Sequence, residues 1–427
     1  MPDDVENAGK GVAPSGCPVA EWYDPLDGPA HPDPFPWYRQ LRQQGRVVYV
    51  PEYDWYVVTR HKEILDVLRD AVTYSNAASL GDVEAVPPEI VEEAGEDWSF
   101  AIRHALVLND PPKHTRLRKL LAPSFTPRRI GQFESLVREI AEVRIEAIAD
   151  RGKGDLGLDF AFHIPNRIIA RILGADEEAA DRFVDWSDGF AAAFLADVAR
   201  DQKLWGWRQL MEQDAYTRNL IEARRRCPAN DLTSDMINAR TDDGGAALSD
   251  EEIVSSTMGL MTAGSESSSV MMLHTMYFLL SHPQQWEEVR ADPSLVPKAI
   301  EEMLRLRGPV RGLFRVAMED VELGGVSIPK GAHIYLHLAS ANNDEDVFEE
   351  PERFDIHRPN LNDHIGFGRW AHFCIGAPLA RLEGRVAIET LIDLLPNLRL
   401  APDFDHRLEY DSNPTIHLAK SLPVEWD

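Results

Sequence analysis

The sequence predicts a mainly α fold with small β-sheets, of the α+β class. Three observations support this prediction. Apolar residues recur at helical spacing through most of residues 133–226. A capping box, Ser-Asp-Glu-Glu, begins a second long helical segment over 249–281, which a His-Pro pair ends. Two short runs of β-branched and aromatic residues, 47–50 and 55–59, indicate a hairpin.

Length and composition describe a chain that can bury a large core. It has 427 residues, 44% of them hydrophobic, and length alone allows two or three domains. With only Cys17, Cys227 and Cys374, no disulfide framework is expected, which favours a reducing cytoplasm. No apolar run approaches the ~18 residues of a membrane span, and residues 1–15 are too polar for a signal peptide. A net charge of −27 disfavours nucleic acid and anionic lipid as partners.

The first hundred residues contain both regular and irregular segments. Residues 1–20 carry glycine, proline and charges without periodicity, so we expect a flexible leader before one folded domain over 21–427. Helices are expected on either side of the hairpin, at 36–44 and 60–68. The segment 75–104 mixes glycine, paired prolines and acids around Trp98 and Phe100, and long loops of this kind are usually functional or disordered.

The later elements follow from breaks in the helical pattern and from short β-like runs. Within 133–226, breaks are expected at 152–154, at 174 and around 199–203. Aromatic residues concentrate in 183–207, where core packing is the ordinary role for most of them. A further helix is expected over 295–307, with strands over 310–316, 321–328 and 332–337 and near 413–418.

The middle of the long helix carries an unusual run of small and polar residues. The helix is ~48 Å long at 1.5 Å per residue, enough to cross the domain. Its centre reads Ala263-Gly264-Ser265-Glu266-Ser267-Ser268, and glycine and serine disfavour helix locally. Glu266 beside the Ser267 hydroxyl suits a distortion that admits water and moves protons. Taken alone, Glu266 is more often a solvated helix residue.

One cysteine lies in a glycine-flanked loop that leads into a helix. Cys374 stands between Gly368 and Gly376, and Ala377-Pro378 begins the helix. Unpaired amides and the dipole at this helix start lower a thiol pKa and favour a thiolate ligand, while glycines let a flat group approach the backbone. A thiolate-bound haem fits this description. An inert buried cysteine is the alternative, whereas zinc needs more ligands than His372 and Cys374 supply.

The ten residues 367–376 resemble the haem-binding loop of the cytochrome P-450 superfamily, whose pattern is Phe-Gly-x-Gly-x-His/Arg-x-Cys-x-Gly. The positions that match are Phe367, Gly368, His372, Cys374 and Gly376. One position differs, because Trp370 replaces the second glycine. We expect its indole to occupy a pocket that offers a partner for its N–H.

The resemblance extends to residues that would bind the haem propionates. It places His114 and Arg118 beside one propionate and Arg315 beside the other, with His372 also contributing. A buried dianionic cofactor needs such cations. On their own, His114 and Arg118 are four residues apart on one helix face, a pattern more typical of a solvated surface.

The centre of the long helix resembles the family's oxygen-activation motif, Ala/Gly-Gly-x-Asp/Glu-Thr. Ala263, Gly264 and Glu266 match it, and Ser267 stands where the family has threonine. Ser267 keeps the hydroxyl but lacks the stiffening methyl group. The resemblance therefore implies that Glu266 and Ser267 deliver protons, in a less tightly ordered way.

Glu302 and Arg305 match the family's Glu-x-x-Arg, and Arg353 matches the arginine that completes this network. A pair at i and i+3 is commonly a surface pair of little energetic weight. The resemblance instead implies a buried network that holds the haem-loop side of the fold.

The resemblance also implies a substrate pocket over the haem. The candidates to line it are Trp98, Phe100, Phe190, Phe194, Ala263, Val310, Arg311, Phe314 and Ile416. Arg311 is the only cation among them, and we expect it to face solvent rather than clamp a substrate carboxylate.

The implied protein is a single-domain, soluble and cytoplasmic haem-thiolate monooxygenase that contains haem b. It would insert one oxygen atom of O2 into a small apolar or aromatic substrate, by hydroxylation or O-dealkylation. Electrons would come from a separate acidic ferredoxin or flavodoxin and its NAD(P)H reductase, because the chain has no fused flavin or iron–sulfur domain. Two alternatives stay open: a peroxide-using or rearranging haem-thiolate enzyme, which Ser267 keeps in view, and a non-enzymatic haem sensor.

A docking face for the donor is predicted from charge. Residues 111–133 and 365–382 contain no acid in a chain with 71 acidic residues. Their cations are Lys113, Arg116, Arg118, Lys119, Arg128, Arg129, Arg369 and Arg381. By resemblance both stretches flank the cysteine side of the haem, so an acidic donor would be steered there.

Overall fold

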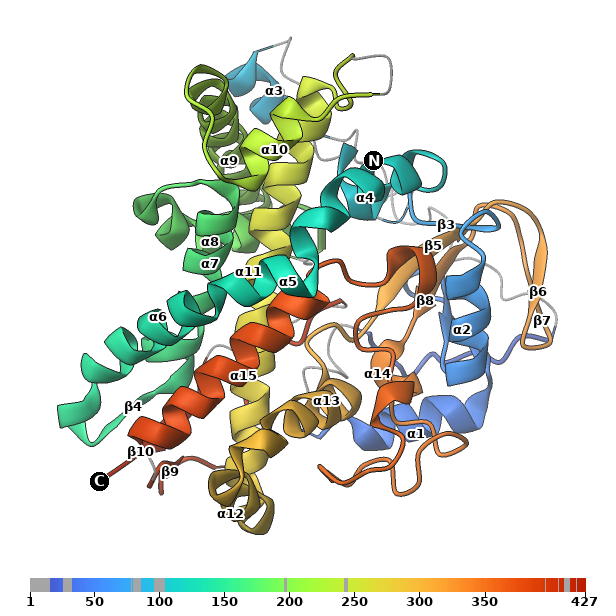
Figure 1. The fold of residues 1–427 in the computed structure, drawn as a ribbon. Helices are drawn as coiled ribbons and strands as arrows, with labels where there is room; N and C mark the ends of the chain where they lie inside the picture. Colours follow the sequence, from blue (N-terminus) through green and yellow to red (C-terminus); the bar gives the residue numbers. More distant parts are fainter. Residues whose placement is uncertain are drawn as a thin grey trace, which may run out of the picture.

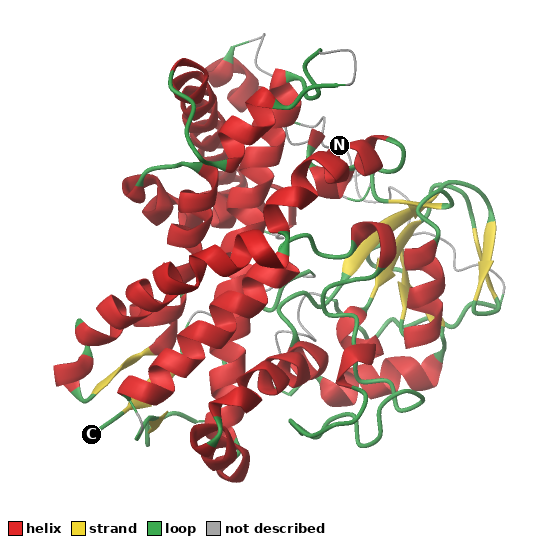
Figure 2. Cartoon of the chain, viewed as in Figure 1, coloured by secondary structure: helices red, strands yellow, loops and turns green. Residues whose placement is uncertain are grey.

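Helices dominate the fold, and most of the strands lie on one side of them (Figures 1 and 2). The computed structural model describes residues 16–25, 33–77, 79, 86–95, 104–195, 198–241, 245–395, 397–405, 407–410, 415–419 and 421–427. The predicted fold class, mainly α with small β-sheets, is confirmed. No helix in these ranges is both long enough and apolar enough to cross a membrane.

The helices are bounded as follows. They are α1 Phe35–Gln44, α2 His61–Arg69, α3 Pro88–Ala94, α4 Lys113–Leu121, α5 Pro127–Ile130, α6 Glu134–Glu146, α7 His163–Leu173, α8 Glu177–Phe190, α9 Arg200–Arg226, α10 Leu232–Asn238, α11 Asp250–Ser281, α12 Pro283–Ala291, α13 Val296–Arg307, α14 Leu338–Ala341 and α15 Ala377–Leu394. Two π-helical turns, η7 Leu156–Ala161 and η8 Ala191–Leu195, and the 3-10 turn η11 Trp370–His372 also matter below.

Three sheets are present within the described ranges. Their strands are β1 Val47–Val50, β2 Trp55–Val58, β3 Tyr74–Ser75, β4 Lys153–Asp155, β5 Leu313–Ala317, β6 Val321–Leu323, β7 Val326–Ile328, β8 His333–Leu336, β9 Arg399–Leu400 and β10 Pro423–Glu425. The largest sheet has the order β1-β2-β8-β5-β3, with β2 and β8 parallel and Val57 opposite Tyr335. The smaller sheets are β4-β10-β9 and the hairpin β6-β7.

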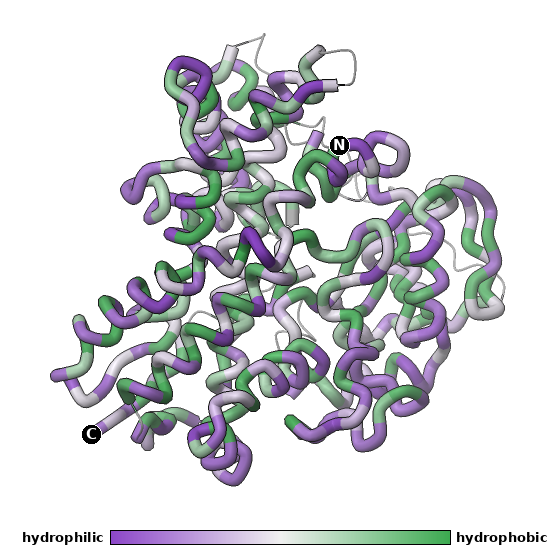
Figure 3. The backbone as a smooth tube through the Cα atoms, in the orientation of Figure 1, coloured by the Kyte–Doolittle hydropathy of each residue, from purple (hydrophilic) through white to green (hydrophobic). Residues whose placement is uncertain are grey.

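The long helix α11 crosses the centre of the molecule (yellow in Figure 1). Its capping box is formed as predicted: the Ser249 hydroxyl accepts from the Glu252 amide, and the Glu252 side chain accepts from the Ser249 amide. α7, α8, α13 and α15 pack against it. It is covered on most sides and has no single apolar face, and both green and purple segments lie in this region of Figure 3. α11 is therefore the central helix, against which the other helices named above pack.

The predicted helices and strands occur close to their expected bounds. The hairpin pairs Val48 with Val57, and α11 ends at Ser281 before a new helix at Pro283. The expected break at 152–154 contains a strand that the sequence did not predict, since β4 pairs with the C-terminal β10. Of the strands expected near 413–418, residues 411–414 lie outside the described residues, and Ile416 forms an isolated bridge with Val310.

The folded chain begins before the predicted boundary at residue 20. Val19 bridges Tyr49 of β1, and the Tyr49 amide donates to the Pro18 carbonyl at 2.8 Å. Cys17 and Ala20 are buried. The prediction of a flexible leader is thus wrong for residues 17–20, because this segment extends the sheet edge, and residues 1–15 lie outside the described residues.

Candidate active site

The Cys374 loop joins the sheet side of the fold to α15. The Cys374 amide donates to the Phe367 carbonyl at 2.8 Å, which closes the loop on itself. Gly368 has φ +67°, a left-handed conformation in which glycine is strongly preferred. A Cβ on Gly376 would lie 3.9 Å from the Cys374 sulfur, so the backbone comes close to the thiol here. The loop thus presents one sulfur at the start of a helix.

Trp370 departs from the expectation of a buried indole. It is 42% exposed and has φ +51°, so a bulky residue occupies the left-handed region. The Arg69 guanidinium lies over its ring, 5.1 Å from the centroid. The predicted pocket is wrong because the η11 turn directs the ring outward toward α2.

Glu301 on α13 ties the loop to α15. Its carboxylate accepts from Arg381 Nε at 2.6 Å and pairs with His364 Nε2 at 2.9 Å. Burial alone would raise the pKa of Glu301, but the hydrogen bonds from Arg381 and His364 lower it to about 2. The Arg381 guanidinium also stacks on the Phe367 ring at 4.7 Å. These contacts fix both ends of the Cys374 loop, and the sequence alone did not single out Glu301 or His364.

The pKa of the Cys374 thiol is raised, whereas the sequence predicted that it is lowered. Burial raises the pKa of Cys374, and the amides of Gly376 and Ala377 and the Arg118 cation offset only part of that effect. The helix start is present as predicted, but desolvation outweighs it. A thiol in this position becomes a thiolate when a metal ion binds it.

Four basic side chains meet beside the loop. The rings of His114 on α4 and His372 lie 4.1 Å apart. Burial lowers the pKa of His114 and brings that of His372 to about 3, and it also lowers the pKa of Arg118 and brings that of Arg315 to about 10. Arg315 donates to the Asn76 side chain at 2.6 Å. The predicted haem-binding residues are therefore brought together from three separate parts of the chain.

This basic cluster fits a buried anionic group. Both ring nitrogens of His114 and Nε2 of His372 are buried without a hydrogen-bond partner among the described residues. Buried polar atoms are rarely left unpaired, and burial disfavours the charged forms of these bases unless an anion pairs with them. Nowhere in the described ranges do three His, Cys, Asp or Glu side chains gather as a metal site. One thiol beside a basic cluster suits a haem, whose iron takes one protein ligand and whose propionates take cations.

The centre of α11 exposes one stripe of surface. Ala263 is exposed and Gly259, Leu260, Gly264 and Ser267 are partly exposed, whereas Ser265, Glu266 and residues 268–276 are buried. Spacings of three and four residues place the exposed positions on one face of the helix. A helix through the middle of the molecule thus has an uncovered face at the predicted oxygen-activation motif.

The predicted distortion of α11 is absent, since the helix is continuous over Asp250–Ser281. Gly264 has another reason to be glycine: a Cβ there would lie 2.7 Å from Ile169 of α7. The Ser267 hydroxyl donates to the Ala263 carbonyl at 2.9 Å, a bond that serine makes within a regular helix. Close packing, rather than local unwinding, therefore accounts for Gly264.

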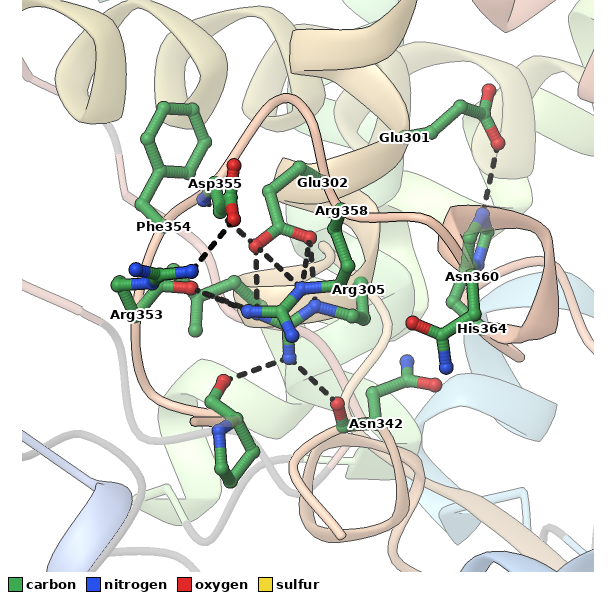
Figure 4. Close-up of polar contacts among 12 residues, drawn as sticks. Glu301, Glu302, Arg305, Asn342, Arg353, Phe354, Asp355, Arg358, Asn360 and His364 are labelled. Carbon is green, nitrogen blue, oxygen red and sulfur yellow. Dashed lines mark hydrogen bonds and ion pairs between the residues drawn. The ribbon is translucent and has the colours of Figure 1, made fainter. Parts of the chain in front are cut away.

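Glu302 and Arg305 form a fully buried pair, with Nε to Oε2 at 2.7 Å and Nη2 to Oε1 at 2.8 Å (Figure 4). The second arginine is Arg358, whose Nε lies 3.2 Å from Glu302 Oε1. The assignment of Arg353 is wrong, because its exposed side chain pairs with Asp355 at 2.8 Å while only its carbonyl accepts from the network. Arg358 lies five residues farther along the same loop, and no local pattern in the sequence distinguishes it.

The substrate-pocket candidates fall into three groups. Phe190 and Phe194 stack 5.1 Å apart at the end of α8, with Trp207 of α9 next to Phe194. Val310, Phe314 and Ile416 are partly buried near the end of the main sheet. Trp98 and Phe100 lie outside the described residues.

Arg311 does not face solvent as predicted. It is 1% exposed and donates from Nη2 to the Pro25 carbonyl at 3.0 Å. Its charge acts on Tyr23 and Tyr335, which places it in a buried aromatic cluster behind the strand. The expected solvent exposure is therefore wrong, whereas the role of a substrate clamp stays a prediction.

Comparison with known proteins agrees with this site. The family model described as Cytochrome P450 matches residues 97–403, more than half of the chain. The chain belongs to the cytochrome P450 family.

Its relatives among bacterial P450s cover nearly its whole length. Cytochrome P450 monooxygenase PikC of Streptomyces venezuelae is 36% identical over 92% of this chain and 91% of its own. Vitamin D(3) 25-hydroxylase of Pseudonocardia autotrophica is 35% identical, covering 95% and 96% of the two chains. The structure of cytochrome P450 CREJ in complex with (4-ethylphenyl) dihydrogen phosphate superimposes with a TM-score of 0.88 at 31% identity, covering 95% and 99%. This P450 is accordingly a haem-thiolate monooxygenase whose cofactor is iron protoporphyrin IX.

Proposed function

We propose that this P450 inserts one oxygen atom of O2 into a small apolar or aromatic molecule, with electrons from a separate ferredoxin or flavodoxin and its NAD(P)H reductase. The observation that carries the proposal is the pairing of a single thiol, Cys374, with unpartnered buried nitrogens on His114 and His372. When bound, the haem supplies the activation of O2, which a thiolate ligand favours.

Each residue of the site has its own part in the proposal. Cys374 ligates the iron, and Phe367, Gly368 and Gly376 shape the loop that holds the sulfur. The two propionates are neutralised by four basic residues, His114, Arg118, Arg315 and His372. The same pairing would offset the free-energy cost of burying these basic side chains. The buried network of Glu302, Arg305 and Arg358 stabilises the haem-loop side of the fold and takes no part in the reaction.

Glu266 and Ser267 handle protons on the exposed stripe of α11. The Ser267 hydroxyl, held on the Ala263 carbonyl at 2.9 Å, keeps an oxygen lone pair free to accept a proton. Glu266 is 5% exposed and next to it in sequence, and in this proposal its carboxyl supplies a proton from the protein interior. In this proposal, the Ser267 hydroxyl would pass that proton to the uncovered face of α11.

The substrate is proposed to be uncharged and apolar. Phe190, Phe194, Val310, Phe314, Ile416 and Ala263 would supply aromatic and aliphatic surface, and the Arg311 guanidinium donates to the Pro25 carbonyl. The relatives act on varied molecules, among them vitamin D(3) and mycinamicin IV by their names. Trp98 and Phe100 stay part of the proposed lining from sequence alone.

An acidic donor is proposed to dock on the cysteine side. Several predicted cations are neutralised there, because Arg116 pairs with Glu252, Arg129 with Asp235 and Arg381 with Glu301. Lys119, Arg128 and Arg369 have no carboxylate partner among the described residues. We also propose a cytoplasmic location, because the three cysteines are free thiols and the proposed NAD(P)H-dependent donor works in a reducing compartment.

Isotope incorporation tests the function. A compound that shifts the ferric Soret band would be incubated with 18O2, NAD(P)H, a ferredoxin and its reductase. The expected product carries one 18O atom and requires all four components. Product formation from peroxide alone, with no dependence on NAD(P)H, would instead establish the peroxide-using alternative.

A further inference from the structure

Trp370 occupies a backbone conformation that disfavours it. Its φ of +51° lies in the left-handed region, which residues other than glycine, asparagine and aspartate seldom adopt. The haem-loop pattern that the chain resembles has glycine at this position. Strained residues persist where the surroundings hold them and often where function uses them.

Core packing does not explain why this residue is a tryptophan. The side chain is 42% exposed, so much of the indole surface faces solvent. Its main contact is with Arg69, at the C-terminal end of α2, whose guanidinium lies 5.1 Å from the ring centroid. Arg69 is itself exposed, and no carboxylate in the described ranges pairs with it. The pair therefore presents a flat aromatic surface and a free cation together.

Arg369 adds a second cation next to this pair in a chain of net charge −27, and the acid Asp70, which follows Arg69, accepts from the amides of Val72 and Thr73. Within the described ranges, the Arg369 guanidinium donates to the carbonyls of Asn362 and His364 and pairs with no carboxylate. The nearby acid Asp66 pairs with Lys62 at 2.7 Å. Trp370 lies four residues before Cys374 and begins the turn that contains His372. A partner bound at Trp370 would therefore lie beside the Cys374 loop.

We propose that Trp370 and Arg69 form the anchor that binds an acidic ferredoxin. Tryptophan and arginine are the residue types that most often dominate binding energy at interfaces. Arg69 and Arg369 would pair with the ferredoxin's carboxylates, while the indole is covered by its apolar surface. In the step that follows, the reduced iron–sulfur cluster loses one electron and the ferric iron gains it, with no bond made or broken. The inference rests on the proposed electron supply.

Reduction kinetics test the anchor on the full haem-loaded protein. Under anaerobic CO, a reduced [2Fe–2S] ferredoxin at subsaturating concentration would be mixed with wild type, Trp370→Gly, Trp370→Phe and Arg69→Glu. We expect Trp370→Gly and Arg69→Glu to lower the second-order rate constant roughly tenfold or more, and Trp370→Phe to lower it less. Trp205→Ala is the matched control, because Trp205 is also 40% exposed but lies on α9, away from the loop. It should reduce at the wild-type rate.

Reduction by dithionite distinguishes a defect in ferredoxin docking from damage to the haem site. Each variant should be reduced by dithionite at the wild-type rate and keep the wild-type ferrous-CO spectrum. Equal ferredoxin rates for wild type and Trp370→Gly would overturn the anchor while leaving the proposed function intact. A wild type that only a flavodoxin reduces would overturn the choice of ferredoxin. If neither protein reduces a wild type that dithionite does reduce, the proposed electron supply itself fails.

Discussion

Glu383 offers a quantitative test of the interior electrostatics. It lies on α15 against α11 and is fully buried. Neither carboxyl oxygen has a well-formed hydrogen bond within the part of the chain that the structure describes, and the Ser268 hydroxyl offsets little of the effect of burial. Burial raises the pKa of Glu383 from 4.5 to about 8. At pH 7 the group is therefore protonated when folded and ionised when unfolded.

The sign and size of its effect on stability follow from this shift. A carboxyl whose folded pKa is raised contributes its full stability below pH 4.5 and loses it as the pH rises toward 8. One pKa unit corresponds to about 1.4 kcal/mol, so Glu383 should remove about 5 kcal/mol of stability across that window. Between pH 5 and pH 7 the loss is about 2.5 kcal/mol.

Glu383→Gln keeps the shape of the neutral acid and cannot ionise. The free energy of unfolding of the haem-loaded protein would be measured in urea at several pH values between 5 and 7. The other titrating groups are common to both proteins and cancel in the difference. Relative to wild type, Glu383→Gln should gain about 2.5 kcal/mol over this range.

Glu301→Gln is the matched control, because the pKa of Glu301 is lowered to about 2. Its stabilising contribution is present above pH 4.5 and lost only as the pH falls toward 2. Glu301→Gln should therefore be less stable than wild type by a constant amount between pH 5 and pH 7. Parallel profiles for wild type and Glu383→Gln would refute the reasoning, because they would show that Glu383 is already ionised in the folded state.

Three further predictions address the site and its support. Glu266→Gln should slow product formation by roughly 10²-fold or more and divert electrons to peroxide, with an unchanged Soret band; normal coupling of NAD(P)H to product would exclude its role. Trp370→Gly should leave the free energy of unfolding within about 1 kcal/mol of wild type, since relief of backbone strain offsets the lost contact with Arg69; a loss of 3 kcal/mol would show a buried ring. Arg358→Ala should destabilise by roughly 3 kcal/mol and Arg353→Ala by less than about 0.5 kcal/mol in thermal or urea unfolding, and the reverse order would restore Arg353 to the network.

The sequence predicted the fold and the grouping of the site where local signals are strong. The capping box and the His-Pro stop fixed α11 almost to the residue. The resemblance to the P-450 family predicted that His114, Arg315 and His372 belong together, and the structure does bring them together with Cys374.

The errors arose where long-range packing decides the outcome. Nothing in the local sequence distinguishes Arg353 from Arg358 as the partner of Glu302. The path of the loop places Arg358 next to Glu302. The burial of Arg311 depends on Tyr23 and Tyr335, which are far apart in the sequence. Gly264 was interpreted as a helix-weakening residue, although its reason is the close approach of Ile169. Sequence patterns report local preference, whereas these features depend on contacts between distant segments.

The ferrous-CO difference spectrum of wild type and Cys374→His tests the central claim most directly. With Cys374 as the iron's thiolate ligand, the wild type gives a strongly red-shifted Soret band, and Cys374→His binds haem with that band absent. A red-shifted band that persists in Cys374→His would contradict the assignment of Cys374, and with it the site built around that residue.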